Sequence, residues 1–284
     1  MNMRIAARRF SFPPRPACRL IQVLGASLAL SLSLTAQAHK AWMLPSATVT
    51  TPGQWITVDA AVSNDLFYFN HVPLRLDSLI VTAPDGSRLT PENPSTGKYR
   101  SVFDLHLPQN GTYKLAMVNR GLFAGYEVDG VQKRWRGTAE RFAAEIPANA
   151  ANLQVSEAHS RLETFVTAGA PTKQVFTTTG LGLELVPITH PNDLYAGETA
   201  IFSFLIDGRA AADLEVSVVP DGTRYRDQQE EMTLRTNAKG ELSITWPRPG
   251  MYWLETSLQD DKTSIAQAQR RRLGYVATFE VLPQ

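Results

Sequence analysis

Five histidines are the residues of this sequence most able to do chemistry, and one of them has a special position. His39 follows the small residues Ala36-Gln37-Ala38 and opens the stretch His39-Lys-Ala-Trp-Met-Leu-Pro45. A peptide-bond cut after Ala38 would make His39 the amino terminus, with an α-amine and an imidazole nitrogen on one residue. The amine has an unperturbed pKa of about 8, so it can lose a proton and coordinate a metal ion near neutrality.

Two further histidines are candidates to complete a metal site with His39. His71 closes the aromatic-rich loop 64–71, and His190 stands in the turn Thr189-His190-Pro191-Asn192-Asp193. Imidazole nitrogens suit nickel, cobalt, copper and zinc ions, so we predict His39, His71 and His190 as ligands. Asp65 and Asp193 are the candidates to support these ligands by hydrogen bonds. The alternatives are a leader-processing role for His39 and structural roles for the loop histidines.

Aromatic side chains near these histidines could wall a ligand pocket and exclude water. We single out four of them, which are Trp42, Phe67, Tyr68 and Phe69. Two other interpretations stay open: aromatic rings on a β-sandwich can stack on sugars, and the same rings can simply fill the core.

No catalytic motif accompanies these residues. The sequence has no Gly-x-Ser-x-Gly, no His-Glu-x-x-His and no glycine-rich phosphate loop. We therefore predict that the protein is not an enzyme, with copper oxidation chemistry at a terminal histidine as the exception.

The first 38 residues have the composition of a secretory signal peptide. Five arginines without any acid precede an apolar run over 20–34, which is short for a membrane span, and small residues follow it. The single cysteine, Cys18, lies in this leader, so the remaining 246 residues can form neither disulfides nor thiolate metal sites. We expect a periplasmic protein without a transmembrane segment in its mature chain.

The charge of the mature chain excludes some partners. Removing the leader leaves 23 basic against 27 acidic residues, a net charge of −4, without a basic block. This composition argues against nucleic acid and against an anionic membrane surface as partners.

Strands must position the candidate residues, because alternating apolar residues and turn signals recur about every ten residues. We predict two hairpins: Tyr99–Leu107 with Thr112–Val118, and Met232–Thr236 with Leu242–Trp246 through Asn237-Ala-Lys-Gly240. Thr138 is the expected N-cap of a short helix over 139–146, which Pro147 ends.

These elements predict an all-β protein of two antiparallel, immunoglobulin-like β-sandwich domains with a short helical insertion. The small and turn-forming residues of 168–180 mark the boundary, with domains over 39–178 and 179–284 after the signal peptide over 1–38.

Two segments resemble a known family. His39-Lys-Ala-Trp-Met-Leu-Pro45 and Gly182-Leu-Glu-Leu-Val-Pro-Ile-Thr-His-Pro-Asn-Asp-Leu-Tyr-Ala-Gly197 are similar to the signatures of the DUF4198 family of exported bacterial proteins. The resemblance implies a periplasmic β-sandwich related to the NikM-type component of nickel and cobalt uptake, with an outer-membrane metal receptor or uptake transporter as partner. NikM-type proteins themselves carry membrane spans, which this sequence lacks.

The sequence therefore predicts a periplasmic protein that binds or delivers a transition-metal ion, which could be nickel, cobalt, copper or zinc. Two alternatives of another class remain, which are a carbohydrate- or polymer-binding module and a structural adaptor of the cell envelope.

Overall fold

A computed structural model describes residues 39–284, and the predicted signal peptide lies outside the described residues. These residues form one compact unit of nineteen strands, one α-helix and two short 3₁₀ helices. The all-β prediction is confirmed. The expected helix is present as α2 (Ala139–Glu145), directly after Thr138. Within 39–284, no helix is long and apolar enough to cross a membrane.

The first sheet has five strands in the order β1-β3-β8-β7, with β4 added to β3. Its strands are β1 (Lys40–Pro45), β3 (Gln54–Ser63), β4 (Val72–Pro73), β7 (Glu92–Thr96) and β8 (Ser101–Leu107). In β8, buried and partly exposed residues alternate without interruption, as the apolar pattern of this segment predicts.

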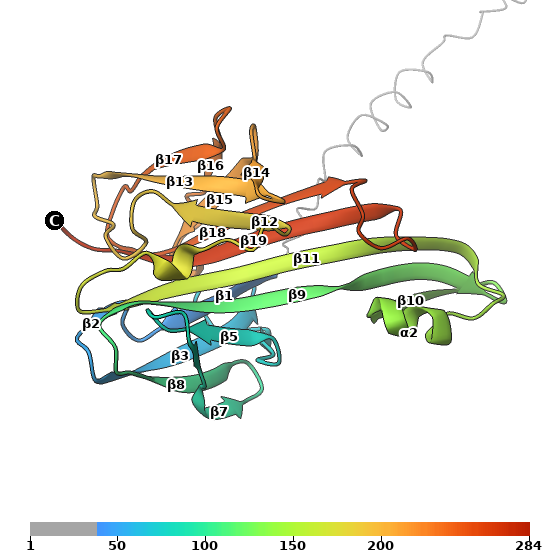
Figure 1. Cartoon of the computed structure of the whole chain (residues 1–284), viewed down its shortest axis with the longest axis horizontal. Helices are drawn as coiled ribbons and strands as arrows, with labels where there is room; N and C mark the ends of the chain where they lie inside the picture. The colour runs from blue at the N-terminus through green and yellow to red at the C-terminus, as the bar shows by residue number, and fades with distance from the viewer. Residues whose placement is uncertain (1–38) are drawn as a thin grey trace, which may run out of the picture. The chain divides into compact units, whose positions relative to one another are not determined.

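The second sheet has ten strands and runs between the other two (Figure 1). Its main order is β16-β15-β18-β19-β11-β9-β5-β6, while β10 pairs with β9 and β2 pairs with β11. The strands are β2 (Val49–Thr50), β5 (Leu79–Thr82), β6 (Arg88–Leu89), β9 (Gly111–Val128), β10 (Val131–Gly137), β11 (Ala151–Ala168), β15 (Glu215–Pro220), β16 (Met232–Arg235), β18 (Gly250–Asp260) and β19 (Arg270–Val281).

The third sheet has four strands, in which β12, β14 and β17 all pair antiparallel with β13. Its strands are β12 (Leu183–Pro187), β13 (Thr199–Ile206), β14 (Arg209–Ala210) and β17 (Glu241–Thr245). The 3₁₀ helices are η1 (Gln174–Phe176) and η2 (Thr223–Tyr225).

Two sandwiches share the ten-stranded sheet. One core lies between the five-stranded sheet and β5, β9 and β11, and includes Phe103 and Tyr113. The other lies between the four-stranded sheet and β15, β18 and β19, and includes Phe202 and Tyr275. The predicted boundary at 178–179 falls between η1 and β12, so it separates most residues of the two cores while the central sheet remains continuous.

The central sheet is held together by β11, whose residues over 162–168 are buried on both faces. Leu162 and Val166 face the first core and Phe165 faces the second, as alternation along a strand requires. β11 pairs antiparallel with β9 and parallel with β19, from Ser156 opposite Arg270 to Thr164 opposite Thr278. This parallel pair is a departure from the purely antiparallel sheets that the sequence predicted.

Both predicted hairpins are wrong in their pairing. β8 belongs to the five-stranded sheet and β9 to the ten-stranded sheet, and β16 and β17 likewise belong to different sheets. The turns are present, but they connect the two layers of a sandwich. At Gly111 the backbone has φ +133° and an added Cβ would lie 2.6 Å from Pro84, so the layer crossing itself requires glycine. A turn signal alone does not distinguish a hairpin from such a crossing.

The contact between β11 and β19 includes a buried polar pair. The Tyr275 hydroxyl donates to Glu163 Oε2 at 2.8 Å, and Tyr275 is fully buried. Burial and the adjacent carboxylate raise the pKa of Tyr275, so its hydroxyl remains protonated as a donor.

Tyr275→Phe should therefore lower the free energy of unfolding by about 2 kcal/mol, because Glu163 loses a donor where water cannot replace it. Urea denaturation measures the change. Tyr225→Phe, at a side chain that is 81% exposed, should leave the stability unchanged. Equal stabilities of the two variants would show that the buried pair contributes nothing.

Candidate functional site

The end of β3 brings two of the predicted histidines together. β1 pairs with one edge of β3, with Lys40 opposite Ser63, and β4 pairs with the other edge, with Val72 opposite Val62. His39 and His71 immediately precede these two flanking strands, so both imidazoles project beyond the same end of β3.

The two imidazole rings stack on each other. Their centroids are 3.7 Å apart and their planes differ by 10°, although 32 positions separate the residues in sequence. His39 is exposed and His71 is partly exposed. A metal ion lies close to the plane of each imidazole that binds it. Two parallel stacked rings therefore cannot share one ion until one ring rotates about its side-chain bonds, which these partly solvated residues are free to do.

Loop 64–70 holds His71 in place through Asn70. The Asn70 Oδ1 accepts a hydrogen bond from the Asn64 backbone N–H at 2.9 Å, and its Nδ2 donates to Asp65 Oδ2 at 2.8 Å. Asp65 also lies 4.0 Å from the guanidinium of Arg224. The predicted supporting residue Asp65 thus fixes the loop before His71.

Of the four predicted pocket aromatics, Trp42 is a core residue in the structure. Its side chain is fully buried, its indole N–H donates to Ser63 Oγ at 2.7 Å, and the rings of Phe67 and Phe69 pack on it at 5.4 and 5.5 Å. Tyr68 is 37% exposed, and the Arg224 guanidinium lies 3.9 Å above its ring. The rings of Trp42, Phe67 and Phe69 therefore form a packed cluster, here called the aromatic floor, without a bare platform for a sugar ring.

Distant residues that the sequence analysis did not select complete this floor. The Trp253 indole N–H donates to the Ala41 carbonyl at 2.9 Å, and the Lys40 ammonium donates to Gln229 Oε1 at 2.5 Å. Burial lowers the pKa of Lys40, although nearby carboxylates, Glu231 first, oppose the shift. About 190 or more positions separate these partners, so no local pattern could have indicated the contacts.

His190 lies away from this pair. Its Nε2 is 2.9 Å from Thr112 Oγ1, and Thr112 bonds to Thr167 on β11. The backbone N–H of Thr167 donates to the Thr48 carbonyl, which lies beyond the far end of β1 from His39. The six residues of β1 alone extend roughly 20 Å, so His190 cannot reach the histidine pair in this conformation.

Both ring nitrogens of His190 already have partners. Its Nδ1 accepts from the Asn192 backbone N–H at 3.2 Å, which leaves the proton on Nε2 to face Thr112 and the Thr172 carbonyl at 3.3 Å. Burial lowers the pKa of His190, which favours this neutral form. The second supporting candidate, Asp193, donates its backbone N–H to the His190 carbonyl and so belongs to the same turn.

The other two histidines also lie apart from His39. His106 stacks on Trp55 at 4.9 Å, at the opposite end of β3. His159 Nε2 donates to Glu157 Oε1 at 2.6 Å on β11. Across residues 39–284, no three side chains of His, Cys, Asp or Glu are grouped so that they could hold a metal ion. The pair of His39 and His71 would need a further ligand, and the α-amine of a cleaved chain is one.

Comparison with known proteins identifies the family. Residues 36–260 match the domain of unknown function DUF4198. The chain belongs to the DUF4198 family. The matched residues include His39, His71 and the whole aromatic floor, with Trp253 among them. No curated protein matches the sequence.

Solved structures show distant similarity. A DUF4785 family protein from Legionella pneumophila has 8% sequence identity and a TM-score of 0.23, with 75% of this chain and 50% of that chain covered. FdeC, an Escherichia coli adhesin, has 12% identity and a TM-score of 0.22, with 87% and 64% covered. This DUF4198 chain therefore spans half of the first protein and less than two thirds of the second.

The surroundings of His190 predict a pH-dependent stability. The unfolded chain takes up a proton at a pH near 6.5, whereas the native chain does so only at lower pH, because the folded pKa is depressed. The contribution of His190 is therefore fully present above pH 6.5 and is lost as the pH falls through the folded pKa. Urea denaturation between pH 7.5 and 5.5 should show a smaller loss of stability in His190→Gln than in the unmodified protein. Parallel pH profiles would contradict this assignment.

Proposed function

We propose that this protein binds a transition-metal ion in the periplasm, through the α-amine and ring of His39 and the ring of His71, and hands the ion on within a metal-uptake system. The observation that carries the proposal is the 3.7 Å approach of two imidazoles from distant segments. Cleavage after Ala38 would add the third nitrogen. The resemblance to NikM-type proteins supports nickel or cobalt as cargo, and an outer-membrane receptor or uptake transporter as the source or recipient.

The chemistry of the pair supports metal binding over simple packing. An amine and an imidazole on one residue form a chelate, so the second nitrogen binds without a further loss of translational freedom. Rotation of one exposed ring then brings His71 to the same ion. Two arginines beside the floor are paired with carboxylates, Arg100 with Asp59 at 3.2 Å and Arg224 with Asp65 at 4.0 Å, which limits their repulsion of an incoming metal ion.

Calorimetry with Ni²⁺, Co²⁺, Cu²⁺ and Zn²⁺ tests the proposal on protein whose first residue is His39. We expect one ion per chain, with Cu²⁺ tightest in line with the general affinity order. His71→Ala should weaken binding by about tenfold or more, because one of three ligands is lost. His106→Ala is the matched control, since it removes an aromatic-stacked surface histidine at the other end of β3.

A second preparation tests the role of the terminal amine. A chain that retains Ala36-Gln37-Ala38 places His39 fourth, where its own amine is part of a peptide bond. This chain should lose most of the affinity. Unchanged affinity would refute the amine ligand, and equal effects of His71→Ala and His106→Ala would refute the site.

A further inference from the structure

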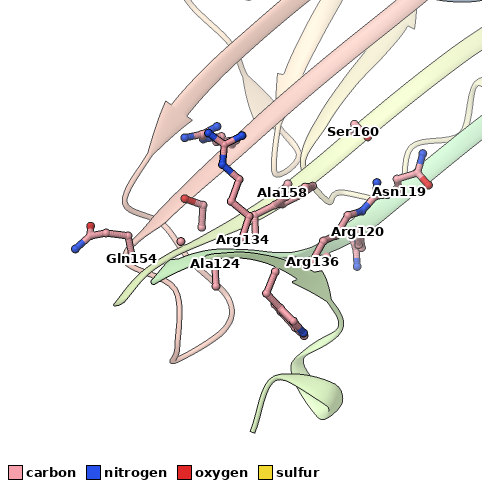
Figure 2. Close-up of a pocket in the computed structure, with 14 residues that line it drawn as sticks. Asn119, Arg120, Ala124, Arg134, Arg136, Gln154, Ala158 and Ser160 are labelled. Carbon is pink, nitrogen blue, oxygen red and sulfur yellow. The ribbon is translucent and has the colours of Figure 1, made fainter. Parts of the chain in front are cut away.

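A large open pocket lies on the central sheet, away from the histidine pair. It has a volume of about 810 Å³ and is formed by β9, β10, β11 and β19, where β9 and β11 extend past the two smaller sheets (Figures 1 and 2). The volume is within the range of roughly 300–1,000 Å³ that is typical of small-molecule sites.

Strand register places three arginines on the pocket's face. Arg134 lies opposite Gly125, and Arg136 lies opposite Phe123. From the other side, Arg272 lies opposite Ala158 across the parallel pair. Residues directly opposite each other on paired strands share a face, so the three guanidinium groups border the same face of the sheet. Arg120 also lines the pocket.

Small residues form the base of the pocket and give it its depth. Gly121, Gly125 and Ala158 lie along its centre, and an added Cβ at Gly125 would meet no atom within 4 Å. Phe123 is 43% exposed and offers an apolar surface, with the Arg136 guanidinium 5.4 Å from its ring. Gln154 and Ser160 add polar groups at the rim (Figure 2).

The pocket's arginines have no carboxylate partners among residues 39–284. None of the four forms a salt bridge or a side-chain hydrogen bond there, and no Asp or Glu lines the pocket. The neighbouring Arg271 shows the contrast, since it binds both Asp207 and Asp260. Glu127 lies on the same face of β9 as Phe123 and Gly125, two positions after Gly125. It lies outside the pocket and accepts hydrogen bonds from Gln132 and Asn152.

We propose that this pocket binds a small organic polyanion with at least two carboxylate or phosphate groups. Guanidinium groups bind both kinds of anion through paired N–H donors, and several unpaired guanidinium groups around one hollow repel each other until an anion is bound. The rim amide and hydroxyl groups suit the hydroxyls of such a ligand. The pocket's size favours a small molecule over a polymer.

Calorimetry at low ionic strength with citrate and with fructose 1,6-bisphosphate tests the proposal, and it separates carboxylate from phosphate ligands. Binding of either one supports the pocket. Arg134→Ala and Arg272→Ala should each weaken binding by about tenfold, as expected for the loss of a charged hydrogen-bonding group. Both side chains are exposed and unpaired, so the variants should retain the thermal unfolding midpoint. Arg209→Ala, an exposed arginine on β14, is the charge-matched control and should bind normally.

Gly125→Leu tests the pocket without changing any charge. The added leucine side chain would enter the open space of the pocket and should weaken binding by about tenfold or more. Wild-type affinity in this variant, or equal weakening by Arg209→Ala and Arg134→Ala, would show diffuse attraction to a basic surface and overturn the proposal. Failure of both probes to bind, or binding only of the polymer heparin, would also overturn it.

Discussion

The parallel pairing of β11 with β19 is the constraint on which the rest of the structure depends. It joins strands from the two halves of the sequence into one sheet, over nine residue pairs. Each half can then cover a different face of the same sheet, which is why Leu162 and Phe165 on one strand serve different cores. Two carboxylates on β11 are buried, so they need internal partners: Glu163 accepts from Tyr275, and Glu157 accepts from Ser264. The shared sheet thus makes one compact unit from two sandwiches.

The same sheet explains how the amino-terminal segment is held. A small core contains Trp42 and Leu66 from the first half and Val219 and Trp253 from the second. The start of β1 is therefore packed against residues about 180 to 210 positions away. Loop 64–70 is tied to η2 by the Leu66 N–H, which donates to Thr223 Oγ1 at 3.1 Å. These contacts fix the backbone on either side of β3. This buried packing holds the strands that His39 and His71 precede, and so places the two histidines next to each other.

The extension of the central sheet has a different consequence. Along β9, Tyr113 and Leu115 are covered by the first core, and residues in the same phase further along include Phe123 and Gly125. The five-stranded sheet ends before it reaches them, whereas α2 covers the opposite face through Phe142, Leu122 and Tyr126. One face of the extension is therefore packed and the other is open. Arginines border the open face. The two candidate sites of the molecule therefore lie on different sheets, the histidine pair at the end of β3 and the pocket on the ten-stranded sheet.

The sequence by itself determined the strand-rich class, the short helix after Thr138, and the family membership that the segment His39-Lys-Ala-Trp-Met-Leu-Pro45 helps to indicate. These depend on local periodicity, capping and motif, which neighbouring residues encode. Only the tertiary structure decided which strands pair, because a turn such as 108–111 looks the same in a hairpin and in a layer crossing. The tertiary structure also decided that the His71 ring stacks on His39, whereas the ring nitrogens of His190 form hydrogen bonds near its own turn. It likewise brought arginines from separate strands to the border of one pocket. Such proximities arise from sheet order and register, which sum contributions from the whole chain and leave no local signature.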